Sequence, residues 1–295
     1  MAFKYTDGIT QMEHFYDLEE GSVDVLVLGS SHAFVNVNPD LLYDEFGIAA
    51  YDLCGSVQPM WNTYYYFKEA LEYQKPKLIV LDVYRLVEEF PYSKDSKIVK
   101  NTYGMKFSRN KYEAIKASLP EDDWENLLLH MVEFPSYHSR YAELTVLDFD
   151  RTRIANDSYK GAHPLEEVNR MKKPKKALKV KAKAEIEPKT MEYFEKILVL
   201  ARENDIPVML INAPYIMTKS DKKIFNTLEE YLEQQTVYED VIYVDFNDMY
   251  EEMDIHFKKD FADENHLNVR GLPKFNHALG NCIKENYSLP DHRKE

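Results

Sequence analysis

Near its start the chain reads Val23-Asp-Val-Leu-Val-Leu-Gly-Ser-Ser-His32, and the interpretation of the fold begins with this stretch. Its apolar, β-branched part, Val23–Leu28, predicts a strand buried in a parallel sheet. Gly29 permits a tight turn after that strand, so that Ser31 stands near the start of the following helix. Backbone N–H groups at a helix start can face a developing oxyanion. The alternative is an ordinary turn whose hydroxyls only cap the helix.

The alternation of strands and helices continues along the chain. Four more short apolar runs are typical of buried strands: Ala49–Leu53, Lys77–Val83, Pro207–Asn212 and Val241–Asp245. Apolar spacing and helix-start residues predict helices at Pro39–Phe46 (capped by Asn38), Pro59–Tyr73, Pro188–Glu203, Asp221–Gln235 and Leu272–Asn286. This order favours an α/β fold, a three-layer α/β/α sandwich around a mostly parallel five-stranded sheet.

One segment, about residues 90–187, lacks this alternation of strands and helices. Within it, Trp124–Val132 is the stretch that we expect to be helical. We therefore expect a single domain over residues 1–295, with this segment as a helical insertion after the third strand. Ligands of open parallel sheets bind beyond the carboxyl ends of the strands. The insertion is accordingly expected to fold over the sheet and cap a site there.

The composition excludes several classes of protein. With 44% hydrophobic and 30% charged residues, the chain of 295 residues has a globular balance and is not wholly disordered. Its apolar runs are too short to span a membrane, and its polar N-terminus does not resemble a signal peptide. We expect a soluble chain, so that any membrane anchor of the natural protein lies outside it. Cys54 and Cys282 form no metal-type spacing.

The net charge of −14 argues against nucleic acid as a partner, because an acidic surface repels a phosphate backbone. One segment has the opposite sign: Arg170–Lys183 carries 8 basic residues and no acidic one. Subtracting its charge of +8 from −14 leaves −22 on the rest of the chain. Two interpretations stay open, a solvated linker or hairpin and a contact with an anionic polymer or membrane surface.

A second polar motif, Asp263-Glu-Asn-His-Leu-Asn268, follows the last predicted strand. A serine hydroxyl is a weak nucleophile until a base takes its proton, and that base needs a partner that fixes its tautomer. Asp263 comes three residues before His266, so one tight turn can present both side chains. Alone, this pattern is common in surface loops. Together with Ser31 at the same edge of the sheet, it predicts a Ser31–His266–Asp263 triad.

With a glycine after the second strand, in Leu53-Cys-Gly-Ser56, these motifs make the chain resemble the SGNH/GDSL hydrolase superfamily. The likeness is to its extracytoplasmic branch, which includes polysaccharide O-acetyltransferases and a family of teichoic-acid D-alanylation. It covers about Val23–Arg85 and Pro188–Cys282, and not the insertion. The superfamily's fold is the flavodoxin-like three-layer sandwich.

The resemblance implies roles for particular residues. Ser31 would be the nucleophile, His266 the general base and Asp263 its orienting carboxylate. The backbone N–H groups of Ser31 and Gly55 would form the oxyanion hole. The resemblance also implies a location outside the cytoplasm, a glycan or other acyl acceptor, a membrane protein among the candidate acyl donors, and acetyl as the expected group.

The chain departs from the superfamily after the third strand. The usual Gly-x-Asn-Asp motif, whose Asn side chain is a further oxyanion donor, is replaced by Leu81-Asp-Val-Tyr-Arg85. Tyr84, Arg85 or a group of the insertion could replace that donor, and a supporting or solvent-facing role is the alternative. In the insertion, His138 and Arg140 are candidates for binding an acyl carbonyl or a sugar hydroxyl, or for a hydrogen-bonded helix end.

Rival chemistries lack their motifs. The sequence contains no Gly-x-Ser-x-Gly elbow, His-Glu-x-x-His pair or Walker loop, and we expect no cofactor and no metal. The resulting hypothesis is a serine O-acyltransferase acting on cell-envelope or exopolysaccharide glycans. Its alternatives are a carbohydrate O-acetyl esterase, a non-catalytic glycan-binding module and a metal-dependent hydrolase using His256 and His266. Trp61 and Tyr64–Tyr66 could stack on sugars, although their helical spacing is more typical of a core.

Overall fold

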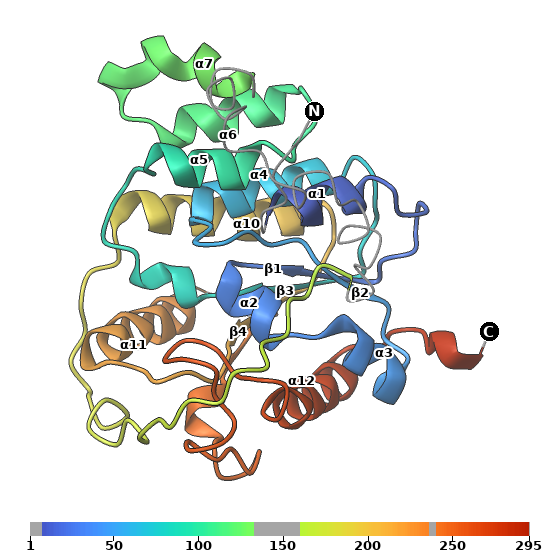
Figure 1. Ribbon diagram of the computed structural model, residues 1–295, viewed down its shortest axis with the longest axis vertical. Helices are drawn as coiled ribbons and strands as arrows, with labels where there is room; N and C mark the ends of the chain where they lie inside the picture. Colours follow the sequence, from blue (N-terminus) through green and yellow to red (C-terminus); the bar gives the residue numbers. More distant parts are fainter. Residues whose placement is uncertain (1–7, 133–159, 236–239, 295) are drawn as a thin grey trace.

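The computed structural model describes residues 8–132, 160–235 and 240–294. Within them, one sheet contains the strands β1 (Val25–Leu28), β2 (Ala50–Asp52), β3 (Leu78–Asp82), β4 (Val208–Asn212) and β5 (Ile242–Asp245). The strands lie in the order β2-β1-β3-β4-β5, and every neighbouring pair is parallel (Figure 1). Each observed strand falls inside a predicted one. The α/β prediction is confirmed, and the sheet is wholly rather than mostly parallel.

Helices cover both faces of the sheet (Figure 1). One face packs against α1 (Ile9–Phe15), α4 (Met60–Ala70), α10 (Pro188–Glu203) and α11 (Lys219–Gln234), and the other against α2 (Ser31–Asn36), α3 (Pro39–Phe46) and α12 (Leu272–Asn286). Side chains alternate along each strand, so Leu26 and Leu28 join the first core while Val25 and Val27 join the second. The predicted three-layer sandwich is confirmed.

The capping signal at α3 works as the sequence indicates. The Asn38 side chain accepts hydrogen bonds from the amides of Asp40 and Leu41 at 3.0 and 3.2 Å, and Pro39 occupies the first turn. Gly47 ends the helix in the left-handed conformation, with a φ of 69°. These local devices explain why the predicted and observed bounds of this helix coincide.

The first part of the insertion builds an outer layer over α4 (Figure 1). It contains α5 (Asp95–Thr102), α6 (Arg109–Ser118), η2 (Glu121–Asn126) and α7 (Leu127–Met131), of which the sequence predicted only the last helical stretch. Trp61 on α4 is buried and donates to the Ser118 hydroxyl at 3.0 Å. Trp61, Tyr65 and Tyr66 therefore belong to the core, which leaves only Tyr64 half-exposed among the aromatic residues considered for sugar stacking.

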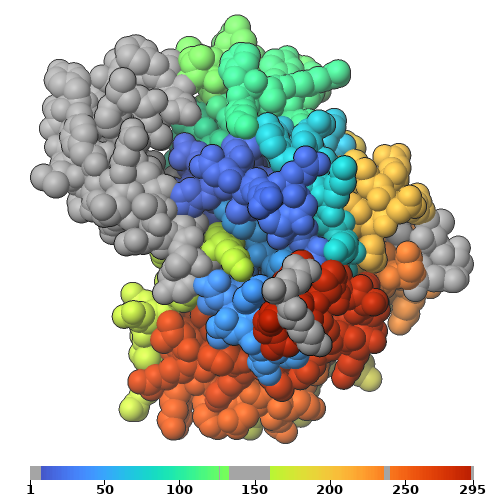
Figure 2. All heavy atoms as spheres, turned by 90° about the vertical axis from the view of Figure 1, so that its right-hand side faces the viewer, coloured from blue at the N-terminus to red at the C-terminus, as the bar shows by residue number. Residues whose placement is uncertain are grey.

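The second part of the insertion, residues 160–187, is an extended segment that crosses the sheet edge and continues past α11 (Figure 1). Its start covers β2, where the Asp52 amide donates to the Lys160 carbonyl at 3.0 Å. A Cβ at Gly161 would collide with the Asp52 carbonyl, so only glycine allows this approach. Figure 2 faces this edge and shows the yellow-green residues of this segment between the N-terminal and α3 regions. An edge strand that is covered in this way cannot template further pairing.

The remaining described elements are short: η1 (Tyr84–Val87), η6 (Phe246–Asp248) and η7 (His292–Lys294). None of the helices in the described ranges is long and apolar enough to cross a membrane. Residues 133–159, on which part of the predicted cap falls, lie outside the described residues.

Candidate active site

The strand order reverses between β1 and β3, and the carboxyl ends of these two strands are where open parallel sheets bind ligands. In sheets of this order the chain leaves neighbouring strands in opposite directions there, and the crevice beyond the carboxyl ends receives the ligand. Ser31 follows β1, and Tyr84 follows β3. The loop that carries Asp263 and His266 lies at the same edge, because His266 contacts Ser31.

The turn after β1 depends on the absence of a side chain at Gly29. Its φ is 154°, and a Cβ there would lie 2.9 Å from Ala33 Cβ and 3.1 Å from Asp82 Cβ. Ser30 caps α2, since its hydroxyl accepts from the His32 amide at 3.4 Å. The capping interpretation therefore applies to Ser30. The hydroxyl of Ser31, the first helical residue, is left to face His266.

Ser31, His266 and Asp263 form a connected row. His266 Nε2 lies 3.3 Å from Ser31 Oγ, and His266 Nδ1 lies 2.9 Å from both carboxylate oxygens of Asp263. The carboxylate thus holds the proton on Nδ1, which leaves Nε2 to accept the serine proton. The His266 side chain is 16% exposed and that of Asp263 50%, so the row opens to solvent at its acidic end.

Two opposing effects set the ionisation of Asp263. Partial burial alone would raise its pKa, but hydrogen bonds from His266 and from the Asn265 amide, with the His266 charge, outweigh burial. The net result is a pKa below the usual value for aspartate. Asp263 is therefore ionised wherever His266 would work as a base.

Asn36, which the sequence patterns did not single out, connects α2, the helix of Ser31, to the loop of His266. Its Oδ1 accepts from the Leu267 amide at 2.8 Å, and its Nδ2 donates to the Asn265 carbonyl at 3.5 Å. Both residues that flank His266 are thus bonded to a buried side chain on α2. Asn276 of α12 donates to the Asn36 carbonyl at 2.9 Å and extends the connection into the core.

The two predicted oxyanion donors are available. In the described part of the chain, the amide N–H groups of Ser31 and Gly55 donate to no acceptor. A Cβ at Gly55 would collide with Asn101 Oδ1 and would lie 2.7 Å from Gln58 Oε1. Asn101 belongs to α5 and donates to the Ser56 carbonyl at 3.4 Å, so the insertion does reach the loop after β2.

A second histidine, His32, follows Ser31 directly in the chain. His32 is fully buried, and its Nδ1 lies 2.9 Å from the carboxylate of Asp82 at the end of β3. Its ring stacks on Tyr84, with 4.3 Å between centroids, and meets the edge of Tyr215 at 5.2 Å. The sequence contained His32 within the motif around Ser31, but nothing in the pattern showed that Asp82 would be its partner.

Tyr84 is the predicted substrate-binding residue that the structure brings to the triad loop. Its hydroxyl donates to Asn265 Oδ1 at 3.2 Å, next to His266. Burial raises the pKa of Tyr84, so its hydroxyl keeps the proton that it donates. The guanidinium of Arg85, by contrast, is largely buried and pairs with Glu88.

The other candidates lie elsewhere. His138 and Arg140 fall outside the described residues, so their predicted contacts stay predictions. His256 is paired with Asp254 at 3.7 Å, and Asp260 accepts from Lys274 at 2.8 Å. Within the described ranges, no three histidine, cysteine or acidic side chains come close enough to hold a metal ion.

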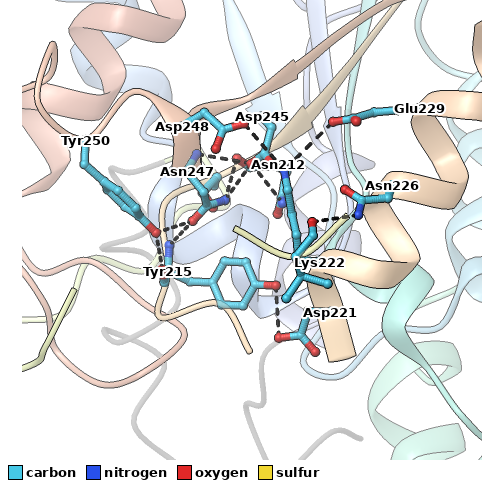
Figure 3. A network of polar contacts seen from close by, with 12 residues as sticks. Asn212, Tyr215, Asp221, Lys222, Asn226, Glu229, Asp245, Asn247, Asp248 and Tyr250 are labelled. Carbon is cyan, nitrogen blue, oxygen red and sulfur yellow. Dashed lines mark hydrogen bonds and ion pairs between the residues drawn. The ribbon is translucent and has the colours of Figure 1, made fainter. Parts of the chain in front are cut away.

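A polar network beyond the ends of β4 and β5 fixes Tyr215 (Figure 3). The Asn247 side chain accepts from the Tyr215 amide at 2.9 Å and from the Tyr250 hydroxyl at 2.6 Å. Lys222 lies 3.1 Å from Asp245, and the two side chains are only 8% and 5% exposed. Because Tyr215 meets His32 edge-on, this network also helps to hold the ring of His32, the residue after Ser31, in place.

Comparison with known proteins does not assign the chain to a family. No family model matches the chain, and no curated protein sequence matches it.

We predict that Gly29→Ala will destabilise the protein and displace Ser31. The added Cβ meets both Ala33 and Asp82 on a backbone that L side chains rarely adopt, so we expect a loss of about 1–3 kcal/mol in urea unfolding. The matched control is Gly21→Ala, where φ is 78° but no atom lies within 4 Å of the added Cβ. Equal losses in the two variants would show that close packing at Gly29 is unimportant.

Lys222→Met is expected to cost about 3–5 kcal/mol at pH 7, because it leaves the carboxylate of Asp245 buried without its cation. Burial already raises the pKa of Asp245 in the presence of Lys222, and the variant should raise it further. The loss should therefore be smaller at pH 5, where Asp245 can take up a proton. Adding Asp245→Asn should recover part of the stability at pH 7. A loss of stability that is the same at pH 5 as at pH 7, and the same with and without Asp245→Asn, would contradict this explanation.

Proposed function

We propose that this protein is a serine acyltransferase that moves an acyl group, acetyl in the simplest case, onto a carbohydrate hydroxyl through an ester on Ser31. The observation that carries the proposal is the 3.3 Å contact between Ser31 Oγ and His266 Nε2, with Asp263 on the opposite imidazole nitrogen. This is the arrangement that turns a weakly nucleophilic hydroxyl into an attacking group.

In the first half-reaction, Ser31 Oγ attacks the acyl carbonyl while its proton moves to His266 Nε2. The Oγ–carbon bond forms, and the oxyanion accepts hydrogen bonds from the Ser31 and Gly55 amides. The bond to the donor's leaving oxygen then breaks, and His266 returns the proton to that oxygen. Asp263 stays ionised throughout and stabilises the imidazolium by its charge.

In the second half-reaction, a hydroxyl of the acceptor gives its proton to His266 and attacks the Ser31 ester. The new acceptor–carbon bond forms, the Oγ–carbon bond breaks, and Ser31 regains its proton. If water takes the acceptor's place, the same steps make an esterase. The choice of a glycan acceptor is supported by the resemblance to polysaccharide O-acetyltransferases and by the partial exposure of the row Ser31–His266–Asp263 at Asp263.

The first test is intact-mass spectrometry after incubation with p-nitrophenyl acetate. We expect one acetyl group on the wild-type chain, mapped to Ser31, and none on Ser31→Ala. Ser22→Ala, at the opposite end of β1, is the matched control and should be acetylated like the wild type. Released acetate is counted in parallel, so that a short-lived ester is not missed. If the wild type gave no acetyl adduct and released no acetate, the proposed chemistry would be overturned.

Acceptor competition separates transfer from hydrolysis. The transferase is supported if an added oligosaccharide accelerates the loss of the Ser31 ester and the acetyl group is recovered on the sugar. Rapid loss to water that no sugar changes contradicts it and indicates the esterase.

We expect Asp263→Asn to lower the rate of Ser31 acetylation by about 10³–10⁴-fold, because an amide no longer holds the reactive imidazole tautomer. Urea unfolding of the same variant is the control, since Asp263 is half-exposed and its loss should change stability little. An acetylation rate close to that of the wild type would exclude Asp263 from the triad.

A further inference from the structure

The segment Arg170–Lys183, called here the basic strip, is the one strongly positive surface that the sequence analysis left unexplained. Two of its cations are paired, Lys173 with Glu251 at 2.8 Å and Lys183 with Glu230. The hydrogen bond from Lys173 lowers the pKa of Glu251, and the charge of Lys175, which makes no ion pair, contributes to that shift. In the part of the chain that the structure describes, the basic side chains outside those two pairs form no ion pair, and all of them are exposed: Arg170, Lys172, Lys175, Lys176, Lys179 and Lys181.

The protein holds the basic strip in a defined conformation. The Met171 amide donates to the Phe257 carbonyl at 2.7 Å, and the Asn226 side chain donates to the carbonyls of Val180 and Ala182, both at 3.0 Å. Ala177, in the middle, is buried. A run of like charges is ordinarily solvated and unstructured, because its members repel one another. Here tertiary contacts hold the backbone of such a run in place, so that an anionic ligand would relieve the repulsion between its cations.

The basic strip begins at the catalytic loop. The Asn169 amide donates to the Phe261 carbonyl at 2.9 Å, and Phe261 bridges to Leu267, the residue after His266. From Arg170 the strip leads away past Phe257 and ends on α11, where the Ala184 amide donates to the Lys223 carbonyl at 3.3 Å. A chain-like ligand on the strip would thus reach the edge of the sheet that carries Ser31.

We propose that the basic strip binds a linear polyanion, a polymer with phosphate or carboxylate groups along its length. The proposed binding depends only on the charges of the basic strip. The further idea that the bound polymer is the acyl acceptor rests on the proposed function. Lysine suits this ligand, because its ammonium is a point charge without the directional fork of arginine.

A polymer fits the surroundings of the strip better than a membrane does. Acidic residues flank it on several sides, with Glu166 and Glu167 just before it and Glu230 and Glu251 beside it. A flat anionic membrane would meet these carboxylates together with the lysines, on a protein whose remaining charge is negative. A single polymer chain can follow the narrow row of cations and avoid its flanks.

The test measures binding of fluorescein-labelled long-chain polyphosphate and polygalacturonate by fluorescence anisotropy over a range of NaCl concentrations. We expect wild-type binding of at least one polymer that weakens steeply with salt, and a loss on the order of tenfold in Lys175→Glu/Lys176→Glu. The matched control, Lys94→Glu/Lys219→Glu, makes the same change in net charge at two exposed lysines outside the strip and should bind nearly as the wild type does. Lys175→Arg/Lys176→Arg should retain binding.

Each outcome separates this proposal from the proposed function. Ser31→Ala should bind the polymers like the wild type, and Lys175→Glu/Lys176→Glu should still form the Ser31 acetyl ester with p-nitrophenyl acetate. Equal losses in the strip and control variants, or no binding of either polymer, would overturn the strip proposal and leave the triad untouched. Strip-dependent binding to phosphatidylglycerol vesicles without binding to either polymer would also overturn it, in favour of a membrane surface.

Discussion

The side chain of Asn36 bonds to the backbone on both sides of His266, through the Leu267 amide and the Asn265 carbonyl. These bonds join two segments that lie more than two hundred positions apart in the sequence. They act together with the Ile216 amide, which donates to the Glu264 carbonyl at 2.7 Å, and with the Tyr84 hydroxyl, which donates to Asn265. Because Asn36 is itself buried and fixed by Asn276, the geometry of the row Ser31–His266–Asp263 is inherited from the packing of α2 against α12.

A second layer of polar contacts surrounds this row from the side of the sheet. Asp82, at the end of β3, receives His32 and the amides of Tyr84 and Ala213, so it links three parts of the edge. Tyr84 continues from there to Asn265. A buried carboxylate with this many donors is satisfied rather than costly. Tyr84 is thus part of a network that reaches the loop of His266, and its hydroxyl is used there as a donor to Asn265.

Positive and negative charges are distributed unevenly along the chain. The chain outside the basic strip has a negative net charge, whereas the strip starts beside the loop of His266 and runs to α11. The segment between β3 and α10 therefore contributes to the surroundings of the candidate site at two places. The α5 end of the insertion contributes Asn101 at Gly55, and the later extended part carries the cations.

Local patterns in the sequence determined the sheet and most of its covering helices. Short apolar runs, most of them rich in β-branched residues, define the five strands, and the pairing of Asn38 with Pro39 marks the start of α3. The rule that parallel strands end at one edge also placed Ser31 and His266 together. Among the described residues, the helices α1, α5 and α6 were missed, and α6 packs through contacts such as Trp61 with Ser118 that join distant positions. For the same reason, only the tertiary structure decided the partners of Asn36, His32 and Asn101. Their hydrogen bonds connect segments whose spacing in sequence carries no periodic signal, and burial rather than local propensity selects them.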